Sequence, residues 1–377
     1  MAAALSRLRL LTLAAAVGAY LPSENVGALQ ADAAPSPVLA LLVHSPARGF
    51  TNAHLWDAWL ANATRENVDV RMFINTWNST AADARTIFEP ARFRQFIINE
   101  TTSSMWCDVT LLESILNLVR HGLADASVTH LVLVSETVVP AKSARAMRDM
   151  LAAEGRSRFC GLNVVSYPGS RMPRPFNQIA TFAEAWWLMS REDALITVND
   201  VPSNLALMSN LMHEEHVTCP EENYFLSAVM THRFARPSAD GSSIASDYIF
   251  GNDPDRAPAG VRLECPMLTD WMGPSPGAPG SIRATTDDGS YHIHLQYQSR
   301  ERCNCSALLP STSLSNAHAT MVSPDNSNAH PFEWRRIDTV AYRQLLHSPF
   351  FFARKVGEDG VSSATADELF GAPVYAR

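Results

Sequence analysis

Positive charge is scarce in this chain. Its 377 residues include 30 Lys and Arg against 38 Asp and Glu, and the formal net charge is -8. A protein that coats nucleic-acid phosphates normally carries a basic stripe. The composition therefore gives no reason to expect a nucleic-acid partner, and basic groups that meet a phosphate must be local. Hydrophobic residues make up 46% of the chain, which is enough to bury a large core in one domain or two.

A long apolar run is also lacking at the N-terminus. The run Leu10–Leu21 is shorter than the roughly 20 residues that a membrane-spanning helix needs. Arg7 and Arg9 precede it and small residues follow at 26–28, as in a cleaved signal peptide. Extension of the run back across Arg9 gives a signal anchor instead. Both alternatives lead into the secretory pathway, so residues 1–37 are interpreted as a signal anchor or signal peptide plus a short stem.

Two other features agree with a secretory compartment. The chain has six cysteines, an even number, as expected where disulfides form, although the sequence does not choose among the pairings. Cys303 and Cys305 lack the second thiolate pair or nearby histidines that would complete a zinc site. Sequons for N-glycosylation occur at Asn62, Asn78, Asn99 and Asn304.

Apolar runs of strand length alternate with helical periodicity over the first half of the chain. The continuous apolar runs Val38–His44 and Thr129–Glu136 predict strands that are buried on both faces, whereas Val68–Asn75 alternates as a strand does. This alternation predicts an α/β fold with a central, mostly parallel sheet flanked by helices. The predicted strands are Val38–His44, Val68–Asn75, Thr129–Glu136 and Phe159–Val165, and the predicted helices are His54–Leu60, Leu111–Leu123 and Lys142–Glu154.

The second half is less regular, and its Pro, Gly, Ser and Asn content predicts loops. These loops are Arg236–Gly260, Gly273–Gly289 and Ser306–Pro331. Order returns at Phe332–Lys355, which predicts one lumenal domain over 38–356 and a C-terminal tail over 357–377. Ligands of open parallel sheets bind beyond the carboxyl ends of the strands. Ser135 and Glu136 therefore lie where a ligand is expected.

Five segments carry a resemblance to a known family. They are FTNAHLWDAWLANA with VDVRMFIN, MWCDVTLLESILNLV with HLVLVSETVVP, EAWWLMSREDA, CPEENYFLSAV, and SPFFFARK with WRRID upstream. In this order they resemble the core-2/I-branching β-1,6-N-acetylglucosaminyltransferases, which are glycosyltransferase family 14-like and include plant-type members. The resemblance covers Val38 to Lys355. Departures from the family pattern are Cys107 for glycine, Ser190 for asparagine and Glu221 for aspartate.

The resemblance implies a type A glycosyltransferase (GT-A-like) fold and inverting transfer of a sugar from a UDP-sugar to a glycan hydroxyl. Glu222 matches the family's catalytic base, which must reach the acceptor hydroxyl. The alternative is that Glu221 and Glu222 only stabilise the N-terminus of the following helix.

Arg336 and Lys355 match the residues that bind the donor diphosphate, and Arg335 is the alternative to Arg336. An ordinary solvated face is the alternative for the whole basic cluster, which also contains Arg354. Further substrate contacts are expected from Ser135, Glu136, Trp186, Glu221, Asp270 and Trp271.

A metal motif is missing where many nucleotide-sugar transferases carry Asp-x-Asp. The place at the end of the mid-sheet strand reads Ser135-Glu136-Thr137, and the Asp-Pro-Asp at 253–255 is typical of a turn. The resemblance implies an enzyme without metal or other cofactor, in which lysine and arginine replace the ion.

We therefore expect a transferase of N-acetylglucosamine from UDP-N-acetylglucosamine to a glycan or glycoprotein. It would lie at the Golgi membrane as a type II protein with a lumenal catalytic domain, or be secreted. Xylosyl- and glucuronosyltransferases of the same superfamily, a catalytically silent carbohydrate-binding protein and a glycoside hydrolase are the alternatives. The adjacent Glu221 and Glu222 do not favour the hydrolase, because its two carboxyl groups must converge on one bond from roughly 5 to 9 Å apart.

Overall fold

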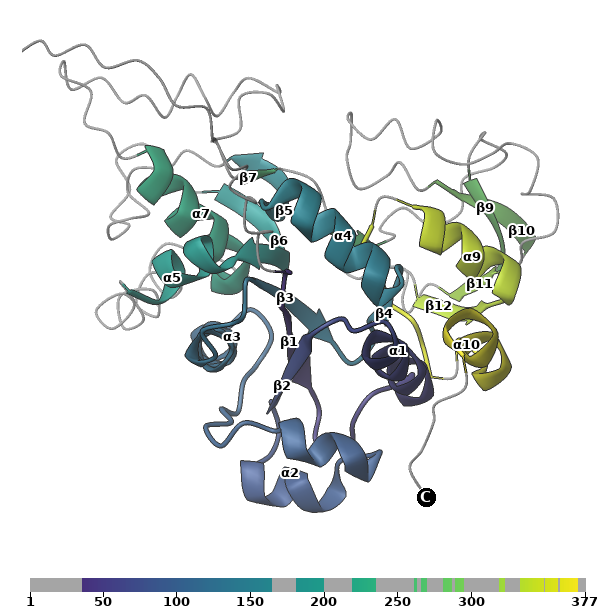
Figure 1. Ribbon diagram of the computed structural model, residues 1–377, viewed down its shortest axis with the longest axis horizontal. Coiled ribbons are helices and arrows are strands. Elements are labelled where there is room, and N and C mark those ends of the chain that lie inside the picture. Colours follow the sequence, from purple (N-terminus) through teal and green to yellow (C-terminus); the bar gives the residue numbers. More distant parts are fainter. Residues whose placement is uncertain are drawn as a thin grey trace, which may run out of the picture. The chain divides into compact units, whose positions relative to one another are not determined.

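The computed structural model describes residues 36–164, 181–199, 219–234, 261–262, 266–269, 281–286, 289–294, 319–322, 333–348, 350–358 and 360–371. Its largest sheet has six strands in the order β2-β1-β3-β6-β5-β7 (Figure 1). Strand β6 is antiparallel to both of its neighbours, and the other pairs are parallel. The strands are β1 (Leu39–Ser45), β2 (Val70–Thr76), β3 (His130–Ser135), β5 (Ser157–Val164), β6 (Thr181–Ser190) and β7 (Val261–Arg262).

Helices connect these strands and cover the sheet (Figure 1). Two of them begin at side-chain caps: Asp108 accepts a hydrogen bond from the backbone of Thr110 before α3, and Ser143 accepts one from Ala146 before α4. The helices of this part are α1 (Ala53–Arg65), α2 (Ala81–Ile87), η1 (Ala91–Phe96), α3 (Val109–Ala124), α4 (Ala144–Glu154), α5 (Arg191–Asn199) and α7 (Pro220–Phe234). The predicted α/β fold with a mostly parallel sheet and flanking helices is confirmed.

The core forms where apolar strands meet the apolar face of a helix. Every residue of β3 is buried, and in β1 only His44 is partly exposed. Helix α3 approaches this layer closely at Gly122, where an added Cβ would come within 2.9 Å of a Leu131 methyl carbon. A larger residue at this position would require the Leu131 side chain to shift.

Two smaller sheets contain strands from the second half of the chain. One has the order β4-β13-β8 and the other β10-β9-β11-β12. Strands β9 and β11 lie inside Gly273–Gly289 and Ser306–Pro331, so the prediction of loops was wrong there. The strands are β4 (Val139–Pro140), β8 (Met267–Thr269), β13 (Phe352–Arg354), β9 (Ser281–Thr286), β10 (Gly289–His294), β11 (Ala319–Val322) and β12 (Glu333–Ile337).

The C-terminal segment contacts the first helix of the domain. After α9 (Thr339–His347) comes α10 (Ser363–Phe370), which packs against α1. The Asn52 side chain, just before α1, donates a hydrogen bond to the Gly357 carbonyl at 2.9 Å. Residues that the sequence assigned to a tail therefore contribute a packed helix. Among the described residues, no helix is long and apolar enough to cross a membrane.

Candidate functional site

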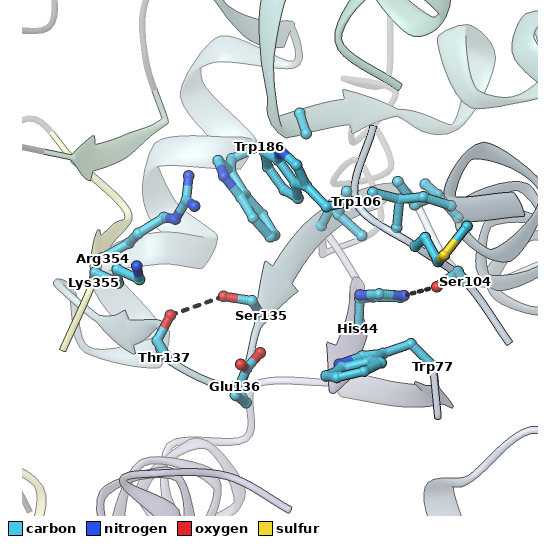
Figure 2. Close-up of a pocket in the computed structure, with 15 residues that line it drawn as sticks. His44, Trp77, Ser104, Trp106, Ser135, Glu136, Thr137, Trp186, Arg354 and Lys355 are labelled. Carbon is cyan, nitrogen blue, oxygen red and sulfur yellow. Dashed lines mark hydrogen bonds between the residues drawn. The ribbon is translucent and has the colours of Figure 1, made fainter. Parts of the chain in front are cut away.

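A cavity of about 390 Å³ opens at the carboxyl-terminal edge of the large sheet (Figure 2). His44 comes from the end of β1, Ser135 from the end of β3, and Trp77 follows β2 directly. Glu136 also lines the cavity. The predicted position of Ser135 and Glu136, beyond the carboxyl end of a buried strand, is thus part of a cavity.

His44 and Ser104 form one wall. The His44 Nε2 atom lies 3.0 Å from the Ser104 hydroxyl oxygen (Figure 2), and burial lowers the pKa of His44 to about 4. At neutral pH the ring is therefore uncharged, and its hydrogen bond fixes the ring's orientation. No sequence motif pointed to His44, which was included only in a predicted strand.

Ser135, Glu136 and Thr137 form the floor. The Ser135 and Thr137 hydroxyl oxygens are 3.1 Å apart, and Thr51 donates a 2.8 Å hydrogen bond to the Glu136 carbonyl, which fixes the turn. Burial raises the pKa of the Glu136 carboxyl above its ordinary value. Its own backbone N–H and the positive charges of Arg354, Arg48 and Lys355 act in the opposite direction. The floor thus offers two hydroxyl groups and a carboxyl group with cations nearby.

Arg354 and Lys355 bring positive charge to the cavity. Arg354 is only 8% exposed, and its guanidinium carbon lies 4.4 Å above the Trp186 ring, which also lines the cavity. An arginine stacked on an aromatic ring keeps its donors in one plane, where they suit paired phosphate or carboxylate oxygens. The position of Arg354 and Lys355 follows from the buried strand β13, because the residues at the end of a buried strand lie at the edge of its sheet.

The other predicted cations are placed differently. Arg336 is exposed on β12 and does not line this cavity, and the Arg335 side chain lies outside the described residues. Strand β12 nevertheless runs beside the cationic segment, since the Trp334 N–H donates to the Lys355 carbonyl at 2.7 Å. Of the basic cluster recognised in the sequence, Lys355 and Arg354 thus reach the cavity.

Glu221 and Glu222 both lie in the first turn of α7, as the helix-stabilising interpretation expected. Neither lines the cavity, but a disulfide between Cys107 and Cys219 connects the start of α7 to the residue after Trp106, a cavity residue. The sequence alone did not decide which cysteines form disulfides. The disulfide therefore fastens the carboxylate pair to the segment that forms the rim of the cavity.

The Glu221 carboxyl is 1% exposed, and its oxygens have no hydrogen-bond partner among the described residues. Burial raises its pKa to about 8. The negative charges of Glu222 and Asp108 also raise this pKa. The backbone N–H groups of Glu221 and Cys107 lower it, although neither forms a hydrogen bond of good geometry with the carboxyl oxygens. Both cysteine sulfurs lie within 4.8 Å of a Glu221 oxygen, yet their bond to each other leaves no thiolate for a metal.

Several predicted residues lie away from the cavity or outside the described part of the chain. Asn78 and Asn99 are exposed, and Asn62 is partly buried. Asp270, Trp271 and Asn304 lie outside the described residues.

The sequence reasoning gave Trp77 and Ser104 no role, and it used Trp106 only for the resemblance. Trp77 lies just beyond the predicted strand Val68–Asn75, which was a local signal, whereas Ser104 and Trp106 lie several residues before the predicted helix Leu111–Leu123.

No protein-family model matches this chain, and no curated protein matches it either.

Proposed function

We propose that this protein is an inverting, metal-independent glycosyltransferase with a type A glycosyltransferase fold. One observation carries the proposal: Arg354 and Lys355 line a cavity at the carboxyl edge of a mostly parallel sheet, beside a carboxyl group and hydroxyl groups. That arrangement suits a nucleotide-sugar, whose diphosphate needs cations and whose sugar needs hydrogen-bonding groups. The five segments that resemble the family support the same function.

The proposed reaction needs one base and one cationic patch. The acceptor oxygen bonds to the anomeric carbon of the donor sugar while the bond from that carbon to the UDP oxygen breaks on the opposite face. The acceptor proton goes to a carboxylate, and the electron pair of the broken bond stays on UDP. Arg354 and Lys355 stabilise the charge that grows on the diphosphate. Arg336 or Arg335 of the adjacent β12 is the further candidate.

Two carboxylates compete for the role of base. Glu222 is supported by its place in the CPEENYFLSAV segment, and Glu136 by its position in the cavity. We propose Glu222 as the base, and Glu136 as a group that hydrogen-bonds the substrate. A base must reach the proton that it removes, so this assignment requires Glu222, which does not line the cavity, to reach the acceptor hydroxyl.

For the donor we propose UDP-N-acetylglucosamine, with xylosyl or glucuronosyl transfer as the alternative within the same superfamily. The acceptor is a hydroxyl of a glycan or glycoprotein. We further propose a place in the secretory pathway, as a type II Golgi membrane protein or as a secreted protein, which the disulfide and the exposed Asn78 and Asn99 sequons support.

The proposal is tested by UDP release from the purified full-length protein, with several UDP-sugars, a panel of glycan acceptors and excess chelator. We expect release that depends on the acceptor and survives chelation. Free sugar released without a nucleotide donor would indicate a hydrolase instead. Sugar binding without any turnover would favour the catalytically silent binding protein.

The release assay, together with a direct measurement of UDP binding, separates the roles of the charged residues. Arg354→Ala and Lys355→Ala should each weaken UDP binding by about 10- to 100-fold, the usual loss for a hydrogen bond to a charged group. Arg336→Ala tests the further candidate, with a smaller expected loss because its side chain is exposed outside the cavity. Glu222→Gln should abolish turnover and leave UDP binding intact. If Glu136→Gln does this instead, Glu136 is the base.

A further inference from the structure

The disulfide between Cys107 and Cys219 is open to solvent. Both half-cystines are partly exposed, and Cys107 directly follows Met105 and Trp106, which are 68% and 55% exposed. Structural disulfides resist reduction, whereas exposed or strained ones are the labile, regulatory or catalytic ones. The exposure of this bond therefore raises the question of whether it exchanges with other thiols.

Both half-cystines also have a strained backbone. Their φ angles are 56° for Cys107 and 55° for Cys219, in the left-handed region that glycine adopts without cost. In the described part of the chain Asn67 is the only other residue besides glycine with a positive φ, and asparagine tolerates this conformation well. Opening of the disulfide lets both cysteine backbones relax, so this strain favours the reduced form.

A buried carboxyl group lies beside the two sulfurs. Both sulfurs are within 4.8 Å of a Glu221 oxygen. Glu221 is 1% exposed, and neither of its oxygens has a hydrogen-bond partner among the described residues. Buried polar groups are normally hydrogen-bonded, so an exception calls for an explanation. Glu221 does not line the cavity, and the proposed sugar transfer gives it no role.

This carboxyl group carries a proton at neutral pH. Burial raises the pKa of Glu221 to about 8, and the negative charges of Glu222 on the same helix and of Asp108 before α3 contribute to the rise. A cysteine thiol ionises at about pH 8.5. A proton passes readily between two groups of similar pKa, which suits general acid catalysis. Glu221 is thus able to give its proton to a departing sulfur and to take one from a thiol.

We infer that the Cys107–Cys219 disulfide is a thiol–disulfide exchange site for a dithiol reductant, with Glu221 as its acid and base. A thiolate of the reductant, whose proton has gone to water, bonds to the Cys107 sulfur on the exposed segment. The bond between the two cysteine sulfurs breaks, and its electron pair goes to the Cys219 sulfur. That sulfur takes the proton of the nearby Glu221 carboxyl.

The second thiol of the reductant completes the exchange. It gives its proton to the Glu221 carboxylate and bonds to the first reductant sulfur. Cys107 leaves as a thiolate and takes a proton from water. The dithiol is oxidised to a disulfide, the protein gains two electrons, and Glu221 regains its proton. The reduced protein lacks the covalent connection between the Trp106 segment and α7, so the redox state of this bond decides whether the cavity rim is fastened to that helix.

The test measures how fast dithiothreitol reduces this disulfide in the purified full-length protein under native conditions. Alkylation of the released thiols, with mass spectrometry of the peptides that contain Cys107 and Cys219, gives the rate, and circular dichroism monitors the fold. At pH 7, reduction of Glu221→Gln should be slower than that of the wild type by about tenfold or more, because glutamine keeps the shape of the protonated acid but has no acidic proton. Glu192→Gln, exposed in the first turn of α5, is the matched control and should react at the wild-type rate.

The pH dependence separates acid catalysis from access to the bond. The ratio of the wild-type rate to the Glu221→Gln rate should fall toward one at pH 9, where Glu221 has lost its proton. A ratio that stays constant from pH 7 to pH 9 would show that the substitution changes only access, which overturns the inference. Equal rates at pH 7, an equal effect of Glu192→Gln, or reduction of the wild type only as it unfolds would overturn it as well. The measurement contains no sugar donor, so its outcome is independent of the proposed transferase function.

Discussion

At the scale of single residues, the first turn of α7 holds a carboxyl group that the fold keeps from water. Glu221 is buried beside the Cys107–Cys219 disulfide, and its pKa is raised to about 8. In the unfolded chain a glutamate ionises near pH 4.5. The folded state therefore retains a proton that the unfolded state releases between these two values, so this group stabilises the fold below pH about 4.5 and loses that contribution as the pH rises to about 8.

Glu221→Gln should remove this pH dependence, because glutamine resembles the protonated acid at every pH. We expect the variant's melting temperature to exceed that of the wild type by an amount that grows from pH 5 to pH 8. Thermal unfolding at several pH values checks this. Glu192→Gln, in the first turn of α5 but exposed, is the matched control. A difference between Glu221→Gln and wild type that stays constant over this range would contradict the assignment.

Single residues also show how far sequence reasoning reached. Lys355, Ser135, Glu136 and Trp186 were predicted at the site and do line the cavity. Arg354 was recognised only as part of a basic cluster, because nothing local distinguishes a cation on a solvated face from one stacked on a tryptophan distant in sequence. That distinction depends on β13 pairing with β4 and β8, which brings residue 354 to the cavity.

At the scale of elements, helix α1 is fixed by polar contacts made through its buried face. Trp56 donates its indole N–H to the Val138 carbonyl at 3.0 Å, and Trp59 donates to the Lys142 carbonyl at 2.8 Å. Both rings are fully buried. The helix is thereby locked to the segment that leads from β3 into α4, directly behind the residues that form the floor of the cavity.

Trp59→Phe and Trp187→Phe form a matched pair that isolates one of these hydrogen bonds. Both rings are buried, but the Trp187 N–H has no hydrogen-bond partner among the described residues. Trp59→Phe leaves the Lys142 carbonyl unpaired, so it should cost about 1–3 kcal/mol more free energy of unfolding than Trp187→Phe. Urea unfolding measures both costs, and equal values would show that the bond contributes nothing.

The elements that the sequence predicted are those whose signals are local. Strands β1 and β3 follow apolar runs, β2 follows an alternating pattern, β5 continues the alternation of elements, and α1, α3 and α4 follow helical patterns. Strand β9 (SIRATT) was missed because it contains no apolar run, and β11 (ATMV) because it has only 4 residues. Their identity as strands comes from pairing with each other and with β10 and β12. Pairing between distant segments leaves little trace in a local pattern.

At the scale of the whole molecule, the last described residues return to the first helix. His54 lies 2.6 Å from the Val361 carbonyl through its Nε2 atom, and Phe370 is buried against Tyr342, with ring centroids 6.1 Å apart. Arg65 of α1 also donates to the Phe370 carbonyl. Residues near the C-terminal end of the described chain therefore contact and stabilise α1, near its N-terminal end.

Removal of residues 357–377 should unfold the domain or lower its melting temperature by more than about 10 °C. The truncation exposes the core around α1 and removes Phe370, and loss of one buried Phe side chain alone costs about 3–5 kcal/mol of a total stability of about 5–15. Removal of 372–377 alone is the control and should change little. Thermal unfolding of both truncated chains decides this, and equal melting temperatures would show that α10 does not support the domain.

The sequence by itself determined the α/β class, strands β1, β2, β3 and β5, helices α1, α3 and α4, and the edge of the sheet where a cavity would lie, because apolar runs and periodicity act over a few neighbouring residues. The tertiary structure decided the pairing of Cys107 with Cys219, the burial of Glu221 and the choice of Arg354 over Arg336 as a cavity residue. Each of these depends on which distant segments come together, and that is fixed only when the strands pair and the core closes.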